Sequence, residues 1–85
     1  MRIVFPNVPP SPTTRDTLAF PALVDEKQAI CEIPSEALQD HCGATTNQTA
    51  DLVAAFKAHR FTIEAVARRM YNPASSRWLL SSKDF

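Results

Sequence analysis

Two neighbouring stretches of alternating apolar residues constrain the fold of this chain more than any other feature. In residues 16–24, every second side chain is apolar and shares one face of an extended strand: Leu18, Phe20, Ala22 and Val24. After Asp25-Glu26-Lys27, the alternation resumes with Ala29, Cys31 and Ile33. Two such runs across a short polar break predict a β-hairpin. Because Pro21 cannot donate a ladder hydrogen bond, we expect the first strand to lie at an edge there or to carry a bulge.

The middle of the chain predicts two helices of unequal length. Pro34-Ser35-Glu36 favours the start of a short helix, and Gly43 favours its end because glycine accepts a positive φ without strain. From Gln48 to about Tyr71, apolar residues recur at the helical period: Leu52, Phe56, Ile63, Val66, Ala67 and Met70. The register does not slip near residue 62. We therefore predict one continuous long helix, with a new helix capped by Thr62 as the alternative.

The remaining segments complete the predicted fold. Residues 2–5 and 77–82 favour strands, whereas the proline-rich residues 6–15 predict an extended connection. The fold class is α+β: a small antiparallel sheet of three to four strands with one short and one long helix packed on one face. A chain of 85 residues fits a single domain, residues 1–85. Six residues are expected to share its core: Leu18, Phe20, Phe56, Ile63, Val66 and Met70.

The charges balance overall but are unevenly distributed. The net charge is zero, so no global field attracts nucleic acid or an anionic membrane. Residues 1–50 carry three basic and six acidic side chains, and residues 51–85 carry six basic and three acidic ones. The two halves therefore complement each other either within the fold or across a homodimer.

Little in the sequence indicates catalysis or metal binding. Four side chains could act as soft or imidazole ligands: Cys31, His41, Cys42 and His59. Their spacing lacks the close pairs of a zinc site, and no glycine-rich turn supplies an anion-binding nest. We expect no catalytic residue, metal or cofactor, and a protein that is not an enzyme. Pro6 precedes any signal-peptide-like apolar region, and no run approaches the ~18 apolar residues of a membrane span. A cytoplasmic protein with reduced thiols is expected.

Several short motifs are spread over nearly the whole chain: Met1-Arg2-Ile3-Val4-Phe5-Pro6, Val8-Pro9-Pro10-Ser11, Phe20-Pro21-Ala22-Leu23-Val24-Asp25, Glu36-Ala37-Leu38-Gln39-Asp40-His41, Ala55-Phe56, His59-Arg60 and Ile63-Glu64-Ala65. Together they resemble the motifs of one family, the bacterial domain of unknown function 1488 (DUF1488). The resemblance implies a cytoplasmic α+β protein without an assigned activity or established site residues. Glu26 replaces the usual glycine of the hairpin turn, so we expect a longer or bulged turn. Cys42 replaces a usual aromatic residue, which favours a core role for it.

The strongest functional signal lies on the predicted long helix. Lys57, Arg60 and Arg68 form a basic stripe, and Phe61 lies among them, nearly opposite the apolar face. Leaving this aromatic ring in water forgoes favourable burial, so we expect Phe61 to contact a protein partner or a second copy of the chain. A helix break at Thr62 would instead turn Phe61 inward. The favoured function is a non-enzymatic interaction or regulatory module that self-associates. The alternative is an auxiliary nucleic-acid-binding protein that uses the basic helix face.

Overall fold

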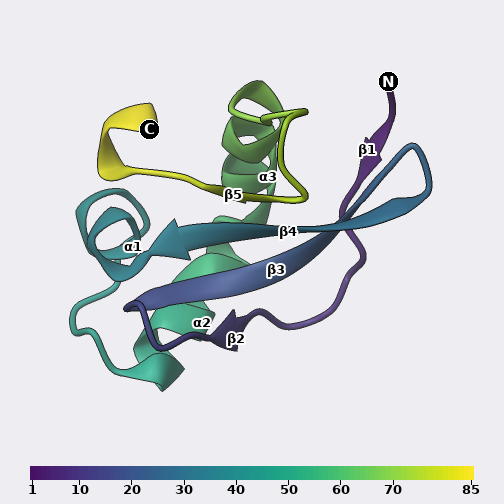
Figure 1. The fold of residues 1–85 in the computed structure, drawn as a ribbon. Coiled ribbons are helices and arrows are strands. Elements are labelled where there is room, and N and C mark those ends of the chain that lie inside the picture. The colour runs from purple at the N-terminus through teal and green to yellow at the C-terminus, as the bar shows by residue number, and fades with distance from the viewer.

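The hairpin inferred from the alternating residues forms the centre of the computed structural model, which describes residues 1–85. Strands β3 (Thr17–Val24) and β4 (Lys27–Pro34) pair antiparallel along their full lengths. Strands β1 (Ile3–Val4) and β2 (Ser11–Pro12) both pair antiparallel with the other side of β3, whereas β5 (Arg77–Leu79) pairs parallel to β4 (Figure 1). The sheet is therefore mixed and five-stranded, not the antiparallel sheet of three to four strands that we expected.

The turn between β3 and β4 is tighter than the sequence suggested. Val24 pairs directly with Lys27, so only Asp25 and Glu26 form the loop. Their φ angles are 49° and 70°, the positive values that a two-residue type I′ turn requires at both positions. The prediction of a longer or bulged turn was wrong. The chain accepts two non-glycine residues in the left-handed region, at a cost of roughly 1–2 kcal/mol each.

The proline-rich segment contributes a strand that the sequence did not predict. Residues 6–15 contain β2, which pairs with Leu18 and Ala19 of β3, while β1 pairs with Leu23 and Val24. Pro21 lies between these two pairings and has a strand partner, Ile30, on one side only. This arrangement confirms the edge position expected for Pro21, whose missing N–H faces no neighbouring strand.

Three helices follow the sheet, and the long helix is not continuous. Helix α1 (Ser35–His41) follows β4 directly, as predicted. Helices α2 (Thr49–Ala58) and α3 (Arg60–Arg69) are separated at His59, whose φ and ψ of −119° and 25° leave the helical region. The break lies before the alternative position at Thr62. The chain changes direction at this break, so α2 and α3 each bury an apolar face of their own. The spacing of the apolar residues in the sequence did not reveal this change of direction.

The core lies between the sheet and helices α2 and α3, which cover one face of the sheet (Figure 1). Phe20 of β3 and Phe56 of α2 meet at its centre, with ring centroids 5.0 Å apart. Five of the six predicted core residues are buried, but Met70 is 40% exposed because it lies just beyond the end of α3. A short 3-10 turn, η1 (Ser82–Asp84), follows β5. No helix has the length and apolar character needed to cross a membrane.

Candidate interaction surfaces

Two members of the predicted basic stripe of Lys57, Arg60 and Arg68 make contacts within the fold. The guanidinium group of Arg60 pairs with Glu64 (Nε to Oε2, 2.8 Å) and donates to the backbone carbonyls of Pro6 (2.6 Å) and Val8 (3.2 Å). Its central carbon also lies 5.3 Å from the centroid of the Phe56 ring. Arg60 is largely buried and attaches the N-terminal segment to α3. A phosphate would have to displace these protein contacts in order to bind Arg60.

The other members of the stripe do not form one free basic surface. The Arg68 guanidinium carbon lies 5.0 Å from the centroid of the Phe5 ring, in cation–π geometry. Lys57 is exposed, but it lies near the end of α2, on the other side of the break at His59. Of the four residues predicted to contact a partner, Arg60 and Arg68 thus contact the N-terminal segment, and Lys57 and Phe61 stay free.

Phe61 lies at the edge of a groove between α3 and the C-terminal residues. The side chain is 87% exposed, the largest exposure of any large apolar residue in the chain. The break at residue 59 did not turn it inward. Along α3 the groove is lined by Thr62, Ala65, Val66 and Arg69, and opposite them by His41, Asp84 and Phe85.

The far wall of this groove is held by packed aromatic and polar contacts. The rings of His41 and Phe85 are stacked, with centroids 5.6 Å apart. His41 Nε2 shares a hydrogen bond with Ser82 Oγ (3.1 Å), and the Arg69 guanidinium donates to the Asp84 carbonyl. We call this feature, with Phe61 at its edge, the α3 groove. The apolar part of its lining, which comprises Phe61, Ala65, Val66 and Phe85, suits an apolar side chain from another molecule.

A second surface, which the sequence analysis missed, is the sheet face opposite the helices. Residues paired across neighbouring strands point to the same face, and on this side most of them are apolar: Val4, Ala19, Pro21, Leu23, Ile30 and Leu79. Leu79 is 63% exposed. The sequence did indicate this second apolar surface, because β3 is apolar at nearly every position, as is typical of strands that are covered on both faces. We call these six residues the open sheet face.

One end of the open sheet face carries a buried carboxylate that accepts four hydrogen bonds from three side chains. Glu32 of β4 is only 4% exposed. Its Oε1 accepts from Thr17 (2.6 Å) and Arg15 Nε (3.3 Å), and its Oε2 accepts from Arg15 (2.6 Å) and Arg77. Burial alone would raise the pKa of Glu32, but these hydrogen bonds and the Arg77 charge lower it to about 2. Arg15, Glu32 and Arg77 are the arginine end of the face.

The two cysteines are poorly placed for nucleophilic chemistry. Both are unpaired and buried, and Cys42 belongs to the core as expected. Burial raises the pKa of each thiol, most strongly for Cys31, beside the Glu32 charge. Such thiols stay protonated near neutral pH and are weak nucleophiles. The His, Cys, Asp and Glu side chains nowhere gather in a group of three that could hold a metal ion.

Comparison with known proteins gives one match. The model of a family described as a protein of unknown function (DUF1488) matches residues 3–80, which include all five strands and all three helices. No curated protein and no solved structure matches the chain. The family description names no ligand or activity, so the two surfaces described above are judged on their geometry.

Proposed function

The chain belongs to the DUF1488 family, and on that premise we propose that it is a cytoplasmic, non-enzymatic interaction module whose α3 groove binds an apolar side chain of a protein partner. One observation carries the proposal: Phe61 is 87% exposed at the edge of a groove whose lining combines apolar residues with polar ones at its margins. Burying such a ring is worth roughly 1.5–3 kcal/mol. An exposed aromatic residue beside an apolar groove is typical of the central residues of protein interfaces.

The chemistry of the other polar groups supports binding over catalysis. The one carboxylate with a strongly lowered pKa, Glu32, is already held by two arginines and a threonine. The two thiols have raised pKa values, opposite to what a nucleophilic cysteine requires. Unpaired buried thiols also fit a reducing compartment, which supports the cytoplasmic assignment.

The nucleic-acid alternative has less support than the interaction module. Its central residue, Arg60, is bound to Glu64 and to two backbone carbonyls. The carboxylate of Glu64 further reduces the local positive charge, and the guanidinium group of Arg68 is already in contact with the Phe5 ring. Nothing in the structure favours this second function.

A comparison of three tagged proteins tests the module. The parent, Phe61→Ser and the control Glu36→Ser are each used to retain proteins from an extract of the source cells, with mass-spectrometric quantification. Both substituted residues are exposed, so all three proteins should unfold at the same urea concentration. We expect a near-stoichiometric partner on the parent and on Glu36→Ser, at least about tenfold depleted on Phe61→Ser. Equal retention by all three proteins would contradict a role for the α3 groove.

A further inference from the structure

The open sheet face carries six apolar side chains without a covering layer, and Gln28, Glu32 and Arg77 lie on the same side in the rows that these residues form. Val4 is paired with Leu23, Pro21 with Ile30, and Ala19 with Glu32, so these side chains form adjacent rows across β1, β3 and β4. Leu79 of β5 extends the row of Ala19 and Glu32. No helix lies on this side of the sheet (Figure 1). A two-sided apolar sheet with one bare face is typical of a surface that another protein layer covers.

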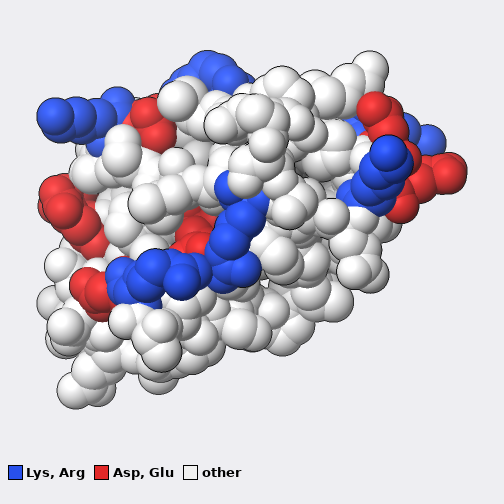
Figure 2. All heavy atoms as spheres, in the orientation of Figure 1, with Lys and Arg blue, Asp and Glu red and all other residues white.

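The two ends of this face carry opposite charge. At the arginine end, Arg15 and Arg77 against Glu32 give a formal charge of +1, and these side chains line a hollow beside Leu79. At the hairpin end, the hollow that includes Val4 and Leu23 is lined by Asp25, Glu26 and Arg2, a formal charge of −1. Lys27 also lies at this end, but it pairs with the core residue Val24 and therefore belongs to the opposite side of the sheet. In Figure 2, which views this face, a group of charged side chains near the centre and another at the right are separated by uncharged surface, and further charged side chains lie along the left and upper margins.

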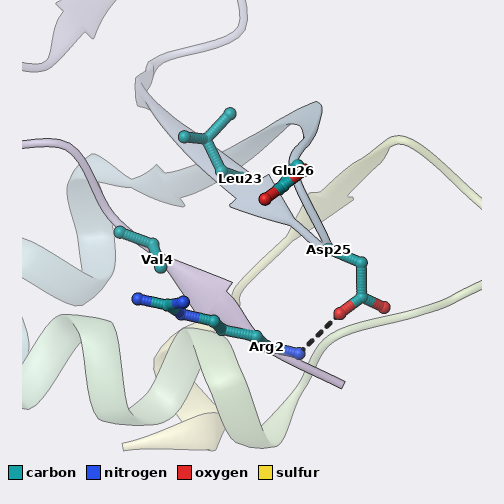
Figure 3. A pocket seen from close by; sticks show the side chains of 5 residues that line it. All are labelled: Arg2, Val4, Leu23, Asp25 and Glu26. Carbon is teal, nitrogen blue, oxygen red and sulfur yellow. Dashed lines mark hydrogen bonds between the residues drawn. The ribbon is translucent and has the colours of Figure 1, made fainter.

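The acidic hairpin end has a carboxylate free for a further contact. Asp25 Oδ1 accepts a hydrogen bond from the backbone N–H of Arg2 (2.8 Å), as drawn in Figure 3. Glu26 lies beside Leu23 in the same view and takes part in no ion pair. At the other end, the guanidinium groups of Arg15 and Arg77 contact Glu32, yet both remain about half exposed. A carboxylate from another molecule could therefore accept hydrogen bonds from the guanidinium N–H groups of Arg15 and Arg77 that do not bind Glu32.

We propose that the open sheet face binds a second copy of this chain, face to face, with the hairpin end of each copy over the arginine end of the other. A two-fold axis in the contact plane and perpendicular to the strands produces this arrangement. In this arrangement the hairpin end of each copy, with a charge of −1, faces the arginine end of the other, with a charge of +1. The apolar rows of the two copies pack together, as in two stacked sheets.

The charge pattern selects this occupant over others. A polyanion or an anionic membrane would be attracted to the arginine end but repelled by Asp25 and Glu26. A second copy satisfies both ends at once, because each end supplies the complement of the other. The contact extends the proposed function to self-association. Because it uses a surface separate from the α3 groove, an experiment can contradict the proposal for one surface without contradicting the proposal for the other.

Sedimentation equilibrium on a series of exposed-residue variants tests the dimer. Leu79→Glu places a charge at the most exposed apolar residue of the face, and Glu26→Lys reverses the charge at the hairpin end. Glu36→Lys makes the same charge change on α1, and Phe61→Ser removes the ring at the α3 groove; both are controls. We expect a parent dimer, dissociation constants raised at least about tenfold in Leu79→Glu and clearly raised in Glu26→Lys, and no change in either control.

Trp78 fluorescence checks that each variant is folded, and Leu79→Ser replaces Leu79→Glu if the charged variant unfolds. A parent that sediments as a 9.4 kDa monomer at every concentration overturns the proposal. So does a dimer that survives Leu79→Glu and Glu26→Lys, or one that Phe61→Ser dissociates instead. If Phe61→Ser no longer retains the partner from the cell extract but still forms the dimer, the two results support a partner site at the α3 groove and a separate dimer contact at the open sheet face.

Discussion

Protonating a single side chain, Glu32, should remove much of the acid-sensitive stability of this fold. The pKa of its carboxyl group falls from 4.5 to about 2, because the hydrogen bonds from Arg15, Thr17 and Arg77 outweigh the cost of burial. Each pKa unit corresponds to about 1.4 kcal/mol, so the ionised group stabilises the folded chain by at most about 3 kcal/mol. The two guanidinium groups are about half exposed and solvent screens them, so we expect about 2 kcal/mol.

The direction of the pH effect follows from the lowered pKa of Glu32. Above the unfolded value of 4.5, the carboxylate is ionised in both states and its full stabilisation of the fold is present. As the pH falls toward about 2, the unfolded chain takes up the proton first and the stabilisation disappears. The loss should therefore occur between about pH 5 and pH 2.

Urea unfolding of the parent and Glu32→Gln measures this contribution. Trp78, the only tryptophan, is buried on the strand next to Glu32 and reports unfolding by fluorescence. At neutral pH we expect Glu32→Gln to be less stable by about 2 kcal/mol, and the two free energies of unfolding to converge near pH 2. Other carboxyl groups titrate in both proteins and cancel in the difference. A difference that stays constant from pH 7 to pH 2 would refute the assignment of a low pKa to Glu32.

Two further predictions concern the core. Phe56→Ala removes a fully buried ring that packs on Phe20 and should lower the free energy of unfolding by about 3–5 kcal/mol, and a loss below about 1 kcal/mol in a urea melt would show that Phe56 is not central. Cys31 and Cys42 should resist a thiol reagent in the native protein and yield two equivalents after unfolding without reductant, since both are buried with raised pKa values. Rapid labelling of the native protein would contradict the burial of the thiols.

The sequence predicted the parts of the fold that depend on local periodicity. The alternation of Leu18 to Ile33 gave the hairpin, and the apolar stripe gave the buried positions of Phe56, Ile63 and Val66. It did not give the direction of β5, because strand direction depends on distant contacts such as the hydrogen bond from Trp78 Nε1 to the Ala67 carbonyl (3.1 Å). The break at His59 was also missed, since a helical period keeps its phase across a single non-helical residue.

The candidate site was harder to predict than the fold. Arg60 seemed free on the helix because its acceptors are backbone carbonyls of Pro6 and Val8, and a carbonyl has no signature in the sequence. Phe61 was singled out correctly as an exposed ring, although its contact with another chain is still a prediction. The open sheet face escaped notice because β3 supplies only part of it, and only the pairing of β3, β4 and β5 brings Ile30 and Leu79 to the same side.

The claim that this chain presents two separate binding surfaces is tested most directly by a methyl NMR dilution series of the purified protein. We predict that the methyl resonances of Val4, Leu23, Ile30 and Leu79 shift together as the protein is diluted, while those of Ala65 beside Phe61 stay in place. Shifts confined to Ala65 and its neighbours on α3, or none at any concentration, would contradict the assignment of the open sheet face to a second copy of the chain.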